Sequence, residues 1–504
     1  MLLLKVVMKQ KKVIIIGAGV GGLASAIRLQ SQGYNVTLVE KNDRVGGRMY
    51  RLEDQGFKFD VGPTIVMMPD VYKELFTYSG ANPDAYLSMQ LLDPLYQLHY
   101  HDGTTLTMSS NLTKLMETLE SFSPEEAQRY LTYLADIYKR YTIANDGFID
   151  RGFLRLRDIL NWKVIRNTFR LRTFNSAYKS ISKFVKNEKL RQALSFQTLY
   201  IGVSPFEGPS IYTIISMIEI MYGIWYIRGG MYAMAEAMQK RFLELGGTIR
   251  LSTPVSSILV EQKKAIGVRL EHEDLFADVV VCNADFPNAV RHLIPTEHRG
   301  KYTEKKFKKM QYSSSAFILY LGLKKKYPTT VHQIRYAKDF KKNIEDLFAP
   351  RMPNDPSFYL YSPTQIDPTL APEGKEILYM LVPVPNREHP SFTWDTSMRQ
   401  SFRNDMMARL QAIPGFEDIL DHIEVEHMYT PKTWEDTFNL IHGATFGLKP
   451  ILFQSNFFRP QANAIKVNHL YFVGSSVHPG AGIPIVLKSA KIVTDIILKE
   501  HPIV

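Results

Sequence analysis

The segment from Lys12 to Arg48 constrains the fold of this 504-residue chain more than any other stretch. An apolar run, Val13 to Ile16, passes directly into the glycine-rich sequence Gly17 to Gly22 and then into an amphipathic helical pattern. A second β-rich run, Val36 to Val39, ends at Glu40. A strand, a glycine turn, a helix and an acid about twenty residues past the glycines are the parts of a dinucleotide-binding βαβ unit.

Each part of this motif has a physical role. Gly17 permits the tight turn, Gly19 lets the backbone approach a pyrophosphate, and Gly22 lets the helix pack closely on the strand. The helix N-terminus offers N–H groups to phosphates. Glu40 stands where a ribose-binding carboxylate belongs. Ala18, Gly21 and Lys41, which lie within or beside these elements, are further predicted cofactor contacts.

Length and cysteine content narrow the class of protein. A chain of 504 residues is long for one core, so we expect two or three domains. The single cysteine, Cys282, follows three valines and is interpreted as a buried strand thiol. No Cys/His cluster has metal-site spacing, so we predict a reducing compartment, an organic cofactor and no metal.

Targeting and membrane-spanning signals are weak. The apolar start at Met1 is interrupted by Lys5 and further lysines, which disfavours a signal peptide. No run reaches the roughly 18 to 20 uncharged apolar residues of a membrane span. The nearest candidate, Ile211 to Ile227, carries Glu219 near its middle and is predicted to be a buried helix that lines a cavity.

The net charge of +11 is concentrated between Arg151 and Arg191, where twelve Lys or Arg accompany two acidic residues. Aromatic and aliphatic residues interleave with these cations, as in a helix lying in a lipid interface. A solvated helix face over a core is the alternative, and both interpretations stay open. No nucleic-acid-binding motif accompanies the patch, so we expect no nucleic-acid partner.

The turn Gly46-Gly47-Arg48, added to the βαβ motif, makes the chain resemble the flavin amine oxidase and carotenoid desaturase superfamily. In that superfamily the Glu binds the adenosine ribose and the Gly-Gly-Arg turn lies along the pyrophosphate and flavin. The resemblance implies FAD as cofactor. It also implies further cofactor contacts. They are Gly62, Pro63 and Thr64 after the Gly-Gly-Arg turn, the backbone of Val255, and, in the C-terminal glycine-rich loop and the helix start that follows it, Gly474, Ser475, Gly482, Ile483 and Pro484.

These signals predict an α/β fold with interleaved domains. A Rossmann-like FAD-binding domain is assembled from residues 1–75, 229–290 and 431–504. Residues 76–228 form a helical region that faces the substrate and membrane, and residues 291–430 form a substrate domain with an antiparallel sheet. Strands of that sheet are predicted at Ser315 to Leu323, Ser357 to Ser362 and Glu376 to Val384.

Further motifs make the resemblance specific to the bacterial carotenoid desaturases. They are Gly62-Pro63-Thr64 with Met68-Pro69, Phe196 to Gly202, Ala371 to Gly374, and His478 to Gly482. Within that family the likeness is greatest to members acting on the C30 precursor 4,4'-diapophytoene. It implies successive FAD-dependent dehydrogenations that give diaponeurosporene-like products. The electron acceptor stays open, with a quinone and oxygen as the candidates. A lipophilic substrate further implies a cytoplasmic enzyme held peripherally at the inner face of the cell membrane through residues Arg151 to Arg191.

Such a reaction needs an apolar tunnel and a route for a proton. Aromatic tunnel candidates are Phe196, Tyr200, Tyr212, Trp225 and Tyr226. Asp158 resembles the acid proposed for phytoene desaturases, although the expected Arg three residues on is Asn161. Glu219, in its apolar run, is a second candidate base, and proton loss to water is a third possibility. His478 is a catalytic candidate or a structural part of a cofactor loop.

Other reactions on the same fold stay open at this point. They are oxidation of the terminal methyl of diaponeurosporene to an aldehyde, and polyene isomerisation or saturation. A non-catalytic lipid-binding flavoprotein is an alternative from another class.

Overall fold

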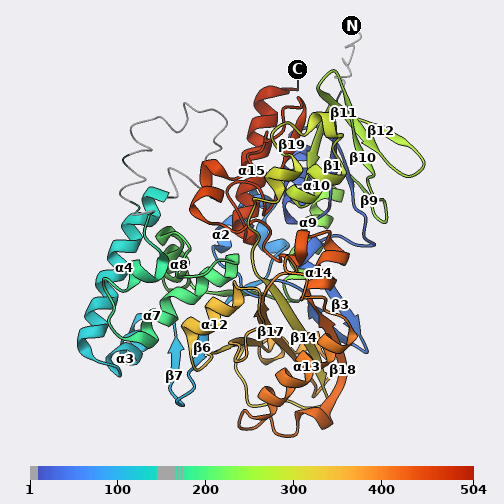
Figure 1. Cartoon of the computed structure of the whole chain (residues 1–504). Helices are drawn as coiled ribbons and strands as arrows, with labels where there is room; N and C mark the ends of the chain where they lie inside the picture. The colour runs from blue at the N-terminus through green and yellow to red at the C-terminus, as the bar shows by residue number, and fades with distance from the viewer. Residues whose placement is uncertain (1–9, 145–165, 167–170, 172–173, 504) are drawn as a thin grey trace.

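A parallel sheet of five strands, in the order β19-β13-β1-β2-β9, forms the upper part of the molecule in Figure 1. The computed structural model describes residues 10–144, 166, 171 and 174–503. All four neighbouring strand pairs are parallel. The strands come from three separated parts of the chain: β1 (Lys12–Ile16), β2 (Asn35–Val39), β9 (Thr248–Arg250), β13 (Val279–Cys282) and β19 (Leu470–Phe472).

Both faces of this sheet are buried, which explains its near-continuous apolar strands. Val13 and Ile15 pack on one face with helices α1 (Val20–Ser31), α9 (Tyr232–Glu244) and α15 (Ile483–Glu500). Ile14 and Ile16 pack on the other face. That face is covered by a small sheet and one helix: β10 (Ser257–Glu261), β11 (Lys264–Arg269), β12 (Asp274–Phe276) and α10 (Phe286–His292).

Cys282 lies in β13 and is fully buried. Burial raises the pKa of its thiol to about 12, so the thiolate is disfavoured near neutral pH. The prediction of a buried strand thiol is confirmed.

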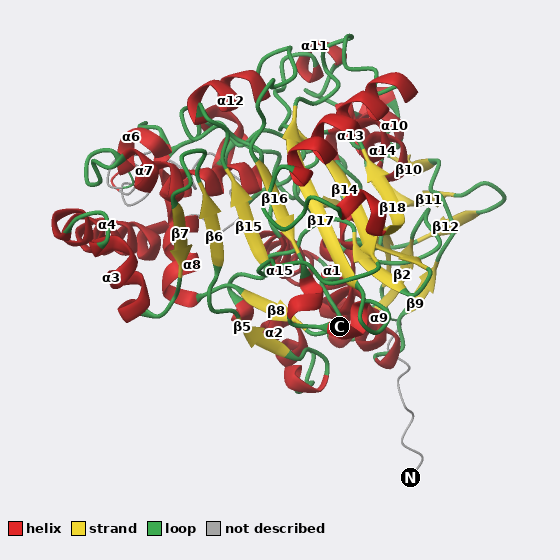
Figure 2. Cartoon of the chain, turned by 90° about the horizontal axis from the view of Figure 1, so that it is seen from below, coloured by secondary structure: helices red, strands yellow, loops and turns green. Residues whose placement is uncertain are grey.

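A second sheet of seven strands, in the order β18-β14-β17-β16-β15-β6-β7, lies below the first (Figures 1 and 2). Only β15 and β6 pair in parallel. Its strands are β6 (Tyr96–His99), β7 (Thr105–Met108), β14 (Ser315–Leu323), β15 (His332–Arg335), β16 (Phe358–Tyr361), β17 (Glu376–Val384) and β18 (Ile423–Tyr429). The bounds of β14 and β17 are those predicted. The predicted helical range 76–228 thus also contributes two strands to this sheet.

Helices α3, α4, α7 and α8 gather beside the β6–β7 edge of the second sheet (Figures 1 and 2). The remaining helices of the described residues are α2 (Pro69–Tyr78), α3 (Leu112–Glu120), α4 (Pro124–Ala144), α6 (Ala177–Ile181), α7 (Glu188–Ser195), α8 (Ile214–Tyr222), α11 (Glu304–Phe307), α12 (Phe340–Leu347), α13 (Thr396–Gln411) and α14 (Pro431–Phe438). Two antiparallel pairs complete the described strands: the hairpin of β3 (Arg51–Asp54) with β4 (Phe57–Asp60), and β5 (Met89–Leu91) with the distant β8 (Trp225–Ile227).

The apolar run from 211 to 227 is divided between two kinds of structure. Only its centre is the α-helix α8, because Gly223 at φ +77° ends the helix and the chain then enters β8. The prediction of one helix over the whole run was therefore wrong at its C-terminal end. Within the part of the chain that the structure describes, no helix combines the length and hydropathy needed to cross a bilayer.

Replacement of Gly22 tests whether α1 must pack closely on the turn after β1. A Cβ at Gly22 would lie 2.0 Å from the Gly17 carbonyl oxygen, so Gly22→Ala forces α1 away from β1. We expect Gly22→Ala to lower the free energy of unfolding by at least about 2 kcal/mol, as overpacking typically does. Denaturant unfolding measures it.

The matched control is Gly80→Ala. Unlike Gly22, Gly80 has a positive φ, of +79°, and nothing lies within 4 Å of its Cβ position, so this variant suffers backbone strain and no steric clash. Equal losses in the two variants would contradict a packing role for Gly22.

Candidate functional site

A cavity of about 560 Å³ lies between the two sheets. Its walls include the carboxyl end of β1 at Ile16, the end of β2 at Val39, and Val473 just past β19. Tyr359 of β16 and Tyr379 of β17 line the opposite side. Ligands of open parallel sheets bind outside the carboxyl ends of the strands, so the position of this cavity is that of a functional site.

Glu40 forms one end of the cavity and is held in place by backbone groups. The Ala18 N–H donates to Glu40 Oε2 at 2.7 Å, and the Asn42 N–H donates to Oε1 at 2.9 Å. The Thr253 N–H donates to the Glu40 carbonyl at 2.7 Å, which brings the 253–255 segment alongside. Glu40, Lys41 and Val255 all line the cavity here.

Two glycine turns lie back to back in the middle of this site. A Cβ at Gly47 would lie 3.1 Å from the Gly19 Cα, and the Gly46 N–H donates to the Ala18 carbonyl at 2.9 Å. A Cβ at Gly62 would lie 2.2 Å from the Arg48 carbonyl oxygen. Side chains at these positions would separate the turns, so glycine is required by close backbone approach.

Arg48 joins the N-terminal turn to the C-terminal loop. Its Nη1 donates to the Thr445 carbonyl at 2.7 Å, and its Nη2 donates to Ser475 Oγ at 2.6 Å. The partly exposed surface of Arg48 faces the cavity. Burial lowers the pKa of the guanidinium, and nearby Asp285 opposes this shift. The residue therefore holds a positive charge at the centre of the site.

Asp285 and Arg459 complete a buried charge group around Arg48. Burial raises the pKa of Asp285, while a 2.5 Å hydrogen bond from Ser476 Oγ and the two arginines lower it. Arg459 is fully buried, and burial lowers its pKa to about 10. Its guanidinium donates to four backbone carbonyls, those of Leu448, Gln454, Ser475 and Val477. Two cations and one carboxylate leave this region net positive.

Nearly all of the predicted cofactor contacts line this one cavity, although they come from distant parts of the chain. The two that do not are Ala18 and Gly22. Ala18 is buried and acts through its N–H to Glu40, and Gly22 packs on the Gly17 carbonyl. The N-termini of α1 and α15 both contribute to the wall, through Val20 and Ile483.

The residues present fit a dinucleotide flavin. A ribose carboxylate stands at one end, glycine turns and two helix N-termini lie along the middle, and a positively charged loop follows. Helix N-termini stabilise the negative charge of phosphates and of a reduced ring. Among the described residues, no group of three or more His, Cys, Asp or Glu has the arrangement of a metal site.

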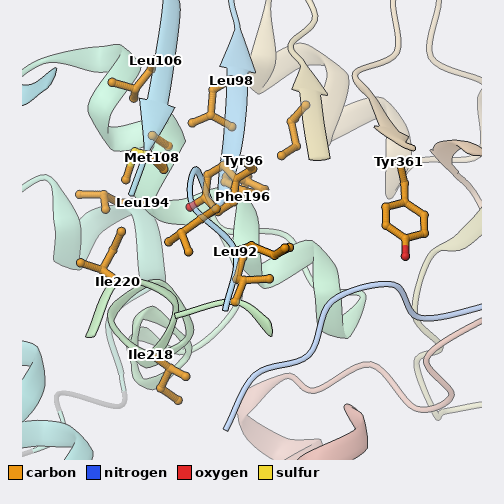
Figure 3. Packing of buried hydrophobic residues seen from close by; sticks show 14 of the residues in the cluster. Leu92, Tyr96, Leu98, Leu106, Met108, Leu194, Phe196, Ile218, Ile220 and Tyr361 are labelled. Atoms are coloured by element: carbon orange, nitrogen blue, oxygen red, sulfur yellow. The ribbon is translucent and has the colours of Figure 1, made fainter. Parts of the chain in front are cut away.

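The remainder of the cavity is apolar and aromatic. Of the predicted substrate residues, Phe196 and Tyr200 line it, with their rings edge to face at 5.6 Å. Figure 3 shows Phe196 next to Tyr96 within the surrounding core. The other three predicted residues, Tyr212, Trp225 and Tyr226, are not in its wall. Their polar atoms instead bond Ser455, the Tyr222 carbonyl and Asp367, respectively.

None of the predicted catalytic residues is seen in the wall of the cavity. Asp158 lies outside the described residues, as does about half of the Arg151 to Arg191 patch. His478 is buried outside the cavity wall, where its N–H donates to the Pro460 carbonyl and its own carbonyl accepts from Ser489 Oγ. Glu219 is fully buried directly behind the wall.

Several residues of the site carried no usable sequence signal. Thr445, Arg459 and Tyr359 reach it through contacts between segments far apart in the chain. Asp285 follows β13, and its position after a parallel strand could have marked it. The others belong to no motif, so only the folded structure brings them in.

Replacement of Arg48 tests the link between the two ends of the chain. Arg48→Lys keeps the charge but cannot make both hydrogen bonds in the same geometry. Losing one or both charge-assisted bonds costs about 1.5–3 kcal/mol, so we expect flavin binding to weaken by about one to two orders of magnitude. Titration of the flavin-free protein with FAD, followed by fluorescence, measures the dissociation constant.

Arg44→Lys is the matched control. Arg44 lies on the same loop, is 37% exposed, and does not line the cavity. Equal FAD affinity in Arg48→Lys and the control would contradict the linking role of Arg48.

Comparison with known proteins gives results at three levels. Residues 20–498 match the family described as flavin containing amine oxidoreductase. The chain is 40% identical over 496 residues to a protein of Staphylococcus aureus named 4,4'-diapophytoene desaturase (4,4'-diaponeurosporene-forming), covering 97% of this chain and 99% of the relative. A Staphylococcus haemolyticus protein of the same name is also 40% identical, covering 96% and 98%. An oxidoreductase structure from Methanosarcina mazei has a TM-score of 0.63 at 18% identity and covers 96% of this chain and 100% of its own.

Proposed function

Because the chain belongs to the flavin containing amine oxidoreductase family, we propose that it is an FAD-dependent desaturase that dehydrogenates 4,4'-diapophytoene to 4,4'-diaponeurosporene. The predicted family, fold class and flavin cofactor are confirmed. The observation that carries the proposal is the continuity of the cavity. A polar, glycine-lined part for a flavin joins an apolar, aromatic part for a polyene without an intervening wall.

When bound, the flavin supplies the hydride-accepting chemistry. The protein must then orient an allylic carbon, exclude water and tolerate positive charge on the substrate. Phe196, Ile218 and Leu381 provide an apolar wall, and the side chains of Tyr359 and Tyr379 line the same space. Aromatic faces stabilise a nearby cation, here the resonance-stabilised cation left on the polyene.

A direct test is anaerobic mixing of the FAD-loaded protein with 4,4'-diapophytoene. We expect bleaching of the flavin absorbance, a red-shifted polyene spectrum, and a product lighter by two hydrogens for each step. Absorbance and mass spectrometry measure these changes.

Each rival reaction gives a different result. An aldehyde formed from diaponeurosporene under air would indicate a terminal oxidase, and an unchanged mass would indicate an isomerase. Flavin that no polyene reduces would indicate a non-catalytic binding protein. Any of these results would contradict the proposal.

We further propose that the enzyme takes its substrate from the inner face of the cell membrane and passes its electrons to a quinone or oxygen. The substrate is a hydrocarbon, so a bilayer is its natural reservoir. Ile215 and Ile218 of α8 line the cavity, while Met221 and Tyr222, at the end of the same helix, are 49% and 42% exposed. This helix therefore connects the cavity wall to an exposed apolar surface, and the basic sequence Arg151 to Arg191 would add attraction to anionic lipid.

Vesicle co-sedimentation tests this membrane proposal. We expect binding to anionic vesicles at low salt, weaker binding at high salt because exposed charges are screened, and little binding to neutral vesicles. Met221→Ser should weaken binding. Leu243→Ser, which changes an equally exposed residue of α9 (48%), should not. Failure of the wild-type protein to bind anionic vesicles at low salt would contradict the proposal.

A further inference from the structure

Glu219 is a buried carboxyl group in an otherwise apolar helix. It lies in α8 between Ile218 and Ile220, and its exposed fraction is 0%. Figure 3 shows both isoleucines within the same apolar cluster as Tyr96 and Phe196. A carboxyl group in such surroundings is costly unless it is hydrogen-bonded or has a function.

Only one of the two carboxyl oxygens is fully engaged. The Tyr96 hydroxyl and Gln197 Nε2 each donate to Glu219 Oε2 at 3.0 Å. Glu219 Oε1 and the Tyr200 hydroxyl form no hydrogen bond with the described residues in this arrangement. The Tyr200 hydroxyl is nevertheless near enough to favour the charged carboxylate.

Tyr200 separates Glu219 from the substrate part of the cavity. Tyr200 lines the cavity together with Phe196 and Ile218, whereas Glu219 does not reach it. The Tyr200 hydroxyl oxygen is itself buried, on the same side as the carboxyl group, so it meets a bound polyene only when the side chain shifts as the substrate binds.

Among the residues that the structure describes, the ionisable groups that interact with Glu219 are tyrosines. They are Tyr96 of β6, Tyr130 of α4, Tyr200 of the 196–201 turn and Tyr336 after β15. Burial raises the pKa of Glu219 to about 7, and the hydrogen bonds from Gln197 and Tyr96 and the nearby Tyr200 hydroxyl limit the shift. The carboxyl group can therefore both take up and release a proton near neutral pH.

We propose that Tyr200 and Glu219 form the relay that removes the proton from the substrate during desaturation, an inference that rests on the proposed function. As the hydride leaves one allylic carbon for the flavin, the neighbouring carbon becomes strongly acidic. Its C–H bond breaks, the electron pair forms the new C=C bond, and the proton passes to the Tyr200 oxygen. The Tyr200 hydroxyl proton moves to the Glu219 carboxylate. Glu219 ends the step as a neutral acid and loses that proton before the next step.

Other buried groups near the cavity suit this role less well. His332 bonds the Tyr359 hydroxyl at 2.6 Å, and that hydroxyl also bonds Thr64 Oγ1 at 2.8 Å. Burial lowers the pKa of His332 to about 3, which makes it a poor proton acceptor. Asp60 is already held by the N–H groups of Met231 and Tyr232 and does not line the cavity.

The test compares Glu219→Gln and Tyr200→Phe with the wild-type holoenzyme in anaerobic single-turnover flavin reduction by 4,4'-diapophytoene, measured across pH. The wild-type rate should rise with pH and level off above an apparent pKa near 7, because only the carboxylate accepts a proton. Both variants should lose this pH dependence and react roughly 100-fold more slowly or worse. Their FAD content and polyene dissociation constants should stay within about twofold of wild type.

Tyr96→Phe gives a graded comparison. It removes a hydrogen bond that favours the charged carboxylate, but Tyr96 does not line the cavity, so the rate should stay pH-dependent with its apparent pKa raised. Glu219→Asp should partly restore the rate and the pH dependence that Glu219→Gln loses. On the flavin-free protein, infrared spectroscopy should show a protonated-carboxyl band that titrates near pH 7 in wild type and is missing in Glu219→Gln.

The outcomes separate this inference from the proposed function. If the wild-type flavin is not reduced, the proposed function fails. If the wild-type flavin is reduced and both variants keep its rate and pH dependence, the relay is wrong and Glu219 is structural. If Glu219→Gln does not fold, Tyr200→Phe and the infrared titration decide the question in the same way.

Discussion

The double hydrogen bond of Arg48 is the interaction on which the site depends. It holds an N-terminal glycine turn against Thr445 and Ser475, which follow about 400 residues later in the chain. Pairing of β19 with β13 and of β13 with β1 brings the two segments to the same edge of the sheet, and Arg48 fixes their turns against each other. Arg459 supports the same loop from behind through four carbonyls, and Asp285 balances part of the positive charge. A flavin needs both ends, so the fold and the cofactor site share one constraint.

The cavity changes character along its length, and this gradient explains how one fold can hold a charged cofactor and a hydrocarbon. Backbone N–H groups, helix N-termini and a guanidinium line the cofactor part. The substrate part is formed by side chains of the seven-stranded sheet and α8, most of which pack in one hydrophobic cluster that is rich in aromatic residues. Glu219 is a fully buried carboxyl group in this largely apolar region, and the proposed relay gives it a task in proton transfer.

Much of this arrangement could be predicted from the sequence, and the reason is local. The glycine turns, Glu40 and the helix starts are set by spacing within a few dozen residues, and strands β14 and β17 by continuous apolar runs. Strands β6 and β7 were not predicted, because they are short and join the sheet through pairing with β15, more than 200 residues away. The same non-local packing placed Tyr212, Trp225 and Tyr226 outside the cavity wall and brought Tyr359 into it. Burial of Glu219 was expected from its apolar neighbours, but its partners Tyr96 and Gln197 required the folded structure.

The most direct test of this account is an experimental structure of the protein loaded with FAD. The account predicts the adenosine ribose at Glu40, the pyrophosphate at the Gly17 to Gly22 turn, and the flavin ring between Arg48 and the Gly474 to Pro484 loop, with its reactive edge toward Tyr200 and Tyr359. A flavin ring that lies away from the C-terminal loop, or that faces away from the apolar part of the cavity, would contradict it.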